Sequence, residues 1–279
     1  MADVIECDPD SLWSIAGAWL ASEPVLHNVV ATVVRRAIET PSPYGDASWY
    51  VVVEAGEPVG AAIMTPPFHL GLTPMSHGPL TDLADALVDR LPTLPGVSGP
   101  GDVALRFAEL WCRRTGAKVE PGMEQLMYRL DTVVPPPPAG GKLRLAAADD
   151  RRLLCEWFEA FTLEAGAVSG DIAKVVDRRL AERALYLWEH STVLTMAGVA
   201  PPVGGVVRVG PVYTPPEMRR RGYASNCVAA LSQQALDDGA TACMLFTDRA
   251  NATSNVIYQR IGYRLVTTAS ACHFRYGRS

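Results

Sequence analysis

Apolar and polar residues alternate in two patterns along the chain, and together they predict a protein of mixed helices and strands. In residues 10–20 the apolar positions Leu12, Ile15, Ala16 and Trp19 have the spacing of an amphipathic helix. Residues 48–54 and 58–65 are rich in apolar residues that favour strands and flank a short turn, which predicts a hairpin. The same criteria predict helices at residues 25–39, 80–91, 102–115, 148–165, 172–184, 225–236 and 254–261, and strands at residues 125–130, 142–146, 184–190, 192–199, 206–213, 242–247, 263–268 and 271–276, with a short strand near Val97.

The predicted elements occur in the same order in the two halves of the chain: two helices, a hairpin, a helix, a strand, a helix and a strand. Thr65-Pro66-Pro67 in the first half and Thr214-Pro215-Pro216 in the second occupy matching places in this order. Residues 135–141 begin with four consecutive prolines, which favour an extended spacer. We therefore predict a first domain at residues 1–134, a linker at 135–141 and a second domain at 142–279.

Composition narrows the class of protein. Hydrophobic residues make up 48% of the 279 residues and charged residues 20%, as in a soluble globular protein, and the net charge of −5 argues against a nucleic-acid partner. No apolar run approaches the ~20 residues of a membrane span, and the acidic start lacks the features of a signal peptide, so we expect a cytoplasmic protein. The six cysteines have no metal-ligand spacing, and we expect no metal.

The region from residue 203 to residue 236 carries the clearest chemical signal. A predicted strand ends at Pro215-Pro216, three arginines and Gly222 follow, and a helix begins. The first amides of a helix lack internal partners and carry a partial positive charge, so they can bind an anion. Glycine lets a phosphate approach the backbone closely, and the arginines add positive charge.

Two motifs in this half resemble those of the GNAT superfamily of acyl-CoA N-acyltransferases. Arg219-x-x-Gly222-x-Ala224 is similar to the family's pyrophosphate loop, and the run from Asn251 through Tyr258 to Gly262-Tyr263 is similar to its next motif. The resemblance covers about residues 143–275. It implies an α/β (α+β) protein of two GNAT-like domains, each with a mixed, mostly antiparallel central sheet flanked by helices.

The resemblance also implies how acetyl-CoA, the expected cosubstrate, would be held. The pyrophosphate would bind the loop and the helix start, formed by Arg219, Arg220, Arg221, Gly222, Tyr223 and Ala224. The pantetheine would lie along the central strand, where Pro211 cannot donate a hydrogen bond but Val212 and Thr214 can. Gly210-Pro211 is a candidate for a bulge that parts the strands. Asn251 is expected to cap a helix and to contact CoA.

The resemblance also implies that Tyr258 is the general acid, because in this family the helix that carries the tyrosine passes beneath the thioester and a phenol can protonate a thiolate of similar basicity. From the residues alone, a core tyrosine that packs on the sheet is the alternative. The base is less defined because the central strand has no glutamate. Candidates are Glu189 and Asp248 at strand ends, with Glu164 and His190 as further possibilities, or a water that relays the proton.

These observations predict an N-acetyltransferase that transfers acetyl from acetyl-CoA to a primary amine, on a small molecule or a protein, by direct attack in a ternary complex. The alternative is a non-catalytic acyl-CoA-binding regulator or scaffold. In the first half, residues 68–76 lack the Arg-x-x-Gly-x-Ala pattern, and Asp82 and Asp85 fall near the start of the predicted helix. We therefore expect a degenerate first domain and one acetyl-CoA per chain.

Overall fold

The computed structural model describes residues 1–40, 44–166 and 170–277. The chain forms two compact units: the first contains Met1–Met127 and the chain from Thr267 onward, and the second is Tyr128–Val266. The chain thus leaves the first unit within strand β6 (Lys118–Leu130) and returns within strand β12 (Arg264–Arg275). This differs from the boundaries expected from the sequence, because the proline-rich residues 135–141 lie inside the second unit and residues 267–279 group with the first.

The two units contain the same succession of elements, which confirms the internal repeat. In the first unit it is β1 (Asp3–Cys7), α1 (Pro9–Ser22), α2 (Asn28–Glu39), β2 (Ser48–Glu54), β3 (Glu57–Met64), β4 (Leu70–Leu72), α3 (His77–Arg90), β5 (Gly96–Pro100), α4 (Val103–Thr115) and β6. In the second it is β7 (Lys142–Leu145), α5 (Arg151–Ala165), α6 (Ile172–Ala181), β8 (Leu185–Glu189), β9 (Val193–Val199), β10 (Val206–Tyr213), α7 (Tyr223–Asp237), β11 (Ala242–Asp248), α8 (Ala252–Arg260) and β12.

The sheet of the first unit has the strand order β1-β2-β3-β4-β5-β12-β6. The β4–β5 pair is parallel, whereas β1–β2, β2–β3, β3–β4 and β5–β12 are antiparallel. Helices α3 and α4 cover one face, where Tyr50, Phe107 and Trp111 are fully buried. The Trp111 indole donates a hydrogen bond of 3.0 Å to the Tyr276 hydroxyl, so the last strand is tied into this core.

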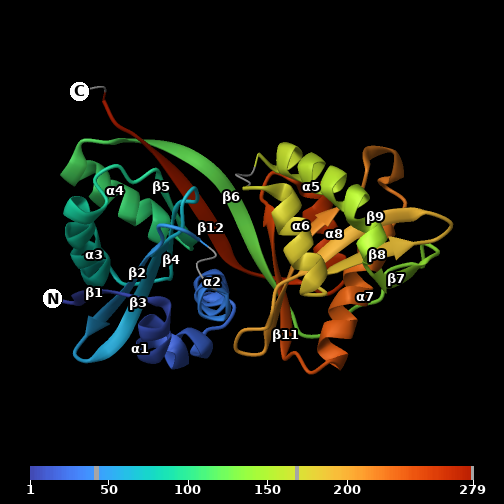
Figure 1. The fold of residues 1–279 in the computed structure, drawn as a ribbon, viewed down its shortest axis with the longest axis horizontal. Helices are drawn as coiled ribbons and strands as arrows, with labels where there is room; N and C mark the ends of the chain where they lie inside the picture. Colours follow the sequence, from blue (N-terminus) through green and yellow to red (C-terminus); the bar gives the residue numbers. More distant parts are fainter. Residues whose placement is uncertain (41–43, 167–169, 278–279) are drawn as a thin grey trace. The chain divides into compact units, whose positions relative to one another are not determined.

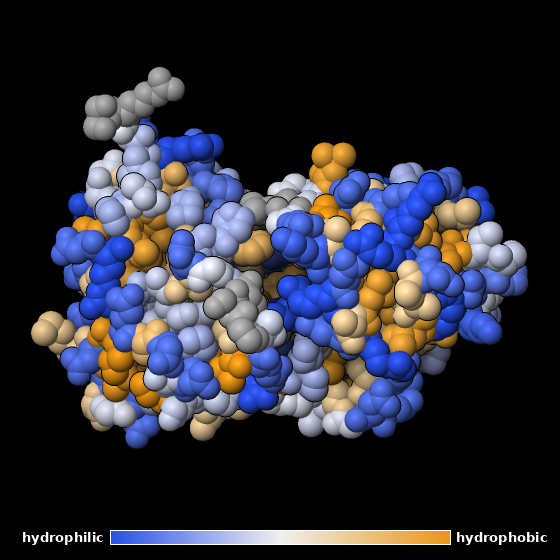
Figure 2. Space-filling view, viewed as in Figure 1, coloured by the Kyte–Doolittle hydropathy of each residue, from blue (hydrophilic) through white to orange (hydrophobic). Residues whose placement is uncertain are grey.

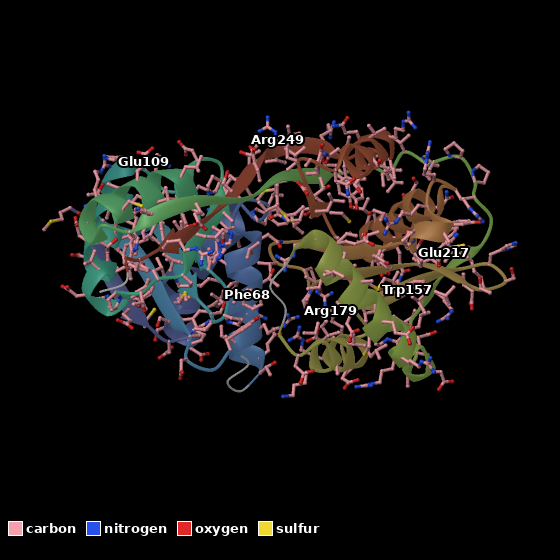
Figure 3. All side chains as sticks on the ribbon, turned by 90° about the horizontal axis from the view of Figure 1, so that it is seen from above. Phe68, Glu109, Trp157, Arg179, Glu217 and Arg249 are labelled. Atoms are coloured by element: carbon pink, nitrogen blue, oxygen red, sulfur yellow. The ribbon has the colours of Figure 1, made fainter. Side chains whose placement is uncertain are left out.

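The sheet of the second unit has the order β12-β6-β11-β10-β9-β8-β7, in which β10 and β11 are parallel. Helices α5 and α6 pack on one face, through Leu154, Phe158 and Val176 against Leu187 and Met196 (Figure 1). Helix α7 contacts strands β7 to β11. Figure 3 shows Trp157 of α5 and Arg179 of α6 on one side of this unit, and Arg249, in the turn between β11 and α8, on the other.

Three predictions about elements were wrong. Strands β1 and β4 were not predicted, because β1 is short and mostly exposed and β4 has only three residues. The two strands predicted over residues 263–276 are one continuous strand, β12. Thr65-Pro66-Pro67 follows β3, whereas Thr73-Pro74 follows β4 and is the counterpart of Thr214-Pro215 after β10.

In the part of the chain that the model describes, no helix is both long and apolar enough to cross a membrane.

Candidate functional site

Strands β10 and β11 form a fork in the second unit. They pair from Val206–Arg208 with Ala242–Met244, and both continue beyond this point, β10 to Tyr213 and β11 to Asp248. Because two parallel strands that stop pairing leave backbone donors and acceptors facing each other, the fork can accept an extended ligand as an added strand.

A bulge in β10 lies beside the fork, as expected for Gly210-Pro211. On the β9 side, Val209 pairs with Val199 and Val212 with Ala197, so Gly210 and Pro211 together face Gly198. Gly210 has φ +146°, a conformation that favours glycine. The bulge bends β10 at the point where it separates from β11.

Arg179 of α6 reaches this bulge beside Gly198 of β9. Its guanidinium donates to the Gly210 carbonyl oxygen at 3.2 Å and lies over the Phe158 ring. It can do so because Gly198 has no side chain: a Cβ there would lie 2.8 Å from Arg179 Nη1 and 2.9 Å from the Gly210 oxygen. Figure 3 shows Arg179 on the side of the unit that α5 and α6 cover. The sequence analysis did not identify Arg179, because it is one of several arginines in a charged helix.

Helix α7 begins at the end of the fork with the features of an anion site. Its N-cap is Gly222 at φ +81°, and its first turn contains no acidic residue. Arg220 also has positive φ, at 62°, which is uncommon for a residue with a side chain. Arg220 and Arg221 are exposed and form no ion pair among the described residues. Figure 2 shows hydrophilic side chains over much of the drawn face of this unit, with smaller hydrophobic patches between them.

Arg219, the first residue of the loop motif, has its side chain engaged elsewhere. Its Nε donates to the Thr214 carbonyl oxygen at 2.8 Å, and its Nη2 contacts both carboxylate oxygens of Glu164 at 2.8 and 2.7 Å. The guanidinium also lies over the Tyr213 ring. Arg219 therefore ties the end of α5 to the loop, and its fork of N–H donors is not directed at the helix start.

The proline-rich segment lies against the start of α7. The Pro137 carbonyl oxygen accepts a hydrogen bond of 3.0 Å from Asn226, and the Gly140 oxygen accepts one of 2.8 Å from Trp188. A Cβ on Gly222 would lie 3.2 Å from that of Ala139. Prolines cannot donate to a sheet but keep their carbonyl acceptors, so this segment can border the anion site without joining a strand.

Tyr258 is buried on α8, 8% exposed, and its hydroxyl makes no hydrogen bond among the described residues. Burial, with a smaller contribution from the nearby Cys227 thiol, raises the pKa of Tyr258 to about 12. The neighbouring Tyr263 ring, 6.0 Å away between centroids, instead has its hydroxyl bonded to Ser232 at 2.8 Å. Tyr258 is thus a protonated phenol with its donor uncommitted.

Two asparagines on α8 have different roles. Asn251 caps the helix, since its side-chain oxygen accepts from the Ser254 amide at 3.0 Å. Asn255, which the sequence analysis did not identify, is buried and donates to the backbone oxygens of Asp248 and Arg249, each at 3.2 Å. Its Oδ1 atom is buried and has no hydrogen-bond partner within the described chain.

The candidate bases lie in different parts of the second unit, and the three carboxylates among them already accept hydrogen bonds. Glu189 lies on β8 and accepts a hydrogen bond of 2.8 Å from Arg144, which lies on the outer strand β7. Strand β9 lies between β8 and the fork. Asp248 ends the β11 arm, where its carboxylate accepts from the Ala250 amide at 2.8 Å. Glu164 is bound to Arg219 at the end of the β10 arm. His190 is exposed in the β8–β9 turn.

The described residues of the first unit do not form a long glycine-containing connection before a helix like the one that precedes α7. Residues 73–76 join β4 directly to α3, whereas residues 214–222 form the longer connection between β10 and α7. Helix α3 begins at His77, so Asp82 and Asp85 lie beyond its first turn, contrary to the prediction. They bind the Ala2 amide and Arg114 instead.

Comparisons with known proteins agree on the fold. Residues 193–271 match the family model described as FR47-like protein, and no curated protein matches the sequence. A GCN5-related N-acetyltransferase from Sphaerobacter thermophilus superposes with a TM-score of 0.63 at 16% identity, covering 96% of this chain and 94% of that one. A GNAT-family acetyltransferase from Colwellia psychrerythraea gives 0.60 at 13% identity over 99% and 100%. A tandem GNAT protein from the clavulanic acid biosynthesis pathway gives 0.61 at 12% identity over 100% of both chains.

The protein therefore has the tandem GNAT fold, with a mixed, mostly antiparallel sheet in each unit, as the sequence motifs predicted.

Proposed function

We propose that the second unit is an acyl-CoA N-acyltransferase site that transfers acetyl from acetyl-CoA to a primary amine. One observation carries the proposal: three features occur together in this unit. They are the fork between β10 and β11, a helix whose N-cap is a glycine and so has no side-chain cap, and the hydroxyl of Tyr258, which donates no hydrogen bond among the described residues. The known structures of the same fold named above include proteins described as acetyltransferases. The first unit, which has no comparable loop, would not bind CoA, so one chain would bind one acetyl-CoA.

The pantetheine arm would lie along β10, with the amides of Val212 and Thr214 as donors. The pyrophosphate would bind the amides of Gly222, Tyr223 and Ala224, helped by the positive end of α7 and by the Arg220 and Arg221 side chains. Arg219 would contribute its backbone, while its side chain fixes the loop through Glu164. Asn251 would border the arm from the start of α8.

In the proposed reaction the neutral amine attacks the thioester carbonyl carbon within a ternary complex, and the carbon–sulfur bond then breaks. An amide near the β10 bulge would stabilise the oxyanion. A base removes a proton from the amine, and we favour Asp248 on the β11 arm, or a water bound by it, over Glu189 because of Glu189's ion pair on the outer strand.

Tyr258 would donate a hydrogen bond, and then its proton, to the leaving thiolate. A phenol with a pKa near 12 is a weak acid towards a thiolate in water, but burial also raises the pKa of the adjacent Cys227 thiol to about 12. Burial that raises the pKa of the phenol would likewise raise the pKa of a thiol bound beside it, which favours proton transfer to the leaving thiolate.

The test is an assay of thiol release from acetyl-CoA over a panel of primary amines, combined with calorimetric titration of CoA. We expect one CoA per chain and turnover with at least one amine class. Tight CoA binding without turnover on a broad panel would favour the alternative, an acyl-CoA-binding regulator. Absence of CoA binding would refute both functions.

A further inference from the structure

The bulge in β10 is bound by a side chain from a different element of the second unit. Two residues of β10, Gly210 and Pro211, lie opposite the single residue Gly198 of β9, so the ladder between these strands is interrupted there. The Gly210 carbonyl oxygen accepts a hydrogen bond of 3.2 Å from the Arg179 guanidinium. Hydrogen bonds from a charged donor are about twice as strong as those between neutral groups. Arg179 therefore fixes the strand at the point where the ladder does not.

Three neighbouring segments accommodate this arginine. On β9, Gly198 leaves room for it, because a Cβ at that position would lie 2.8 Å from the Arg179 Nη1 atom. On α5, the Phe158 ring lies against the guanidinium, with 5.9 Å between Cζ and the ring centroid. After α6, the Ala184 amide donates to the Arg179 carbonyl oxygen at 2.9 Å. Both the backbone and the side chain of Arg179 are therefore held, as a residue that fixes another strand must be.

The bulge lies where β10 separates from β11. The last pair between these two strands is Arg208 with Met244, two residues before Gly210. Pro211 has no N–H, so the first backbone donor beyond the bulge is the amide of Val212. Because the bulge sets the direction of the chain that follows it, a change in its conformation would move this amide.

We propose that Arg179 is a positioning residue for acyl transfer, which holds the bulge so that the Val212 amide donates to the carbonyl oxygen of the bound thioester. The inference rests on the proposed function and adds to it a residue of α6 that belongs to neither sequence motif. Arg179 acts through the strand and touches neither substrate. Its position matters because a displacement of about 1 Å at a reacting centre can lower the rate about 10²-fold.

The test separates alignment of this amide from binding in general. The probes are acetyl-CoA and S-ethyl-CoA, which share the whole CoA moiety but differ in the carbonyl oxygen, and their affinities are measured by calorimetry on the full chain without an amine. We expect the parent to bind acetyl-CoA about fivefold more tightly, the size of one net hydrogen bond. Arg179→Met keeps a long apolar stem without a donor and should bind both probes equally. Its kcat should fall about tenfold or more, because a misaligned donor stabilises the oxyanion less.

Three further variants accompany this one. Arg179→Lys keeps a charged donor and should recover part of the preference and of kcat. Gly198→Ala displaces the guanidinium from its site and should also lose the preference, so it replaces Arg179→Met if that variant does not fold. Arg152→Met removes an arginine of α5 that is 91% exposed, and it should match the parent in both measurements.

A preference for acetyl-CoA that persists in Arg179→Met would overturn the inference, whether or not kcat falls, and so would its persistence in Gly198→Ala if Arg179→Met does not fold. Equal affinity of the parent for both probes would also overturn it, because no donor would then bind the carbonyl oxygen. In each case CoA binding and turnover leave the proposed function standing. Absence of CoA binding in the parent would instead refute that function.

Discussion

Tyr258 and Tyr263 offer a matched pair of substitutions, because the same atom can be removed from two neighbouring buried phenols that differ in their partners. Tyr258→Phe removes a hydroxyl without a hydrogen bond among the described residues, so no partner is left unpaired and the melting temperature should stay within about 2 °C of the parent. Tyr263→Phe breaks the 2.8 Å bond to the fully buried Ser232. Leaving that serine unpaired should cost about 1–3 kcal/mol, or several degrees in melting temperature.

The effects on catalysis should be the reverse. Loss of a general acid lowers the rate by about 10²–10⁴-fold, so Tyr258→Phe should reduce kcat by at least 10² while the affinity for CoA is unchanged. Tyr263→Phe should keep kcat within about twofold. Because the pKa of Tyr258 is raised to about 12, the parent's kcat should not fall between pH 8 and pH 10 through loss of this proton. Thiol release measured over that range, with melting curves, is the assay. A Tyr258→Phe variant with parental kcat would refute its role as acid.

Two more substitutions test the surroundings of the site, and a third tests a buried histidine of the first unit. Gly198→Ala should raise KM for acetyl-CoA and cost about 1–3 kcal/mol in unfolding experiments, since its Cβ would displace the guanidinium that holds the bulge, whereas Gly78→Ala, which has open space in α3, should be neutral or stabilising. Glu164→Gln should raise KM for acetyl-CoA by loosening Arg219, with kcat and its pH profile unchanged; a lost acid limb would instead make Glu164 the base. Burial lowers the pKa of His69, so as the pH falls the unfolded chain takes up this proton at a higher pH than the folded chain does. The melting temperature should therefore decrease as the pH is lowered from about 6.5, and it should decrease less steeply in His69→Gln.

Local sequence patterns predicted most of the elements and the connection in which Gly222 precedes helix α7. Apolar residues spaced three to four positions apart predicted the helices, and apolar residues spaced two positions apart predicted the strands of the hairpins. Both patterns involve residues that are close in the sequence. Gly222 at the start of α7 could be identified because an anion can approach the first amides of a helix closely only where no side chain covers the backbone. These features are encoded within short stretches, so one sequence is enough to find them.

The features that sequence reasoning missed depend on distant pairing. Nothing in residues 264–275 indicates that one half of β12 belongs to each unit, because the strand pattern is the same whichever sheet it joins. Strand β4 is too short for a pattern. Asn255 lies in a predicted helix, where the sequence pattern would equally allow an exposed polar residue. Only the fold shows that this asparagine is buried. The contact of Arg179 with the β10 bulge depends on Gly198 of strand β9, which is distant in the sequence.

The division of strands β6 and β12 makes the second unit an insertion in the first. The chain leaves the first unit in β6 and re-enters in β12, and these two strands are neighbours in the sheet. Residues 128–266 could therefore be excised and β6 joined to β12 by a tight hairpin turn, which would leave the first unit with every strand it uses. A cut in the proline-rich segment would instead deprive each unit of a strand. Both chain ends belong to the first unit (Figure 1), so a fusion partner at either end would extend from that unit, and the segment with the candidate site would remain an uninterrupted module that can be exchanged as one piece.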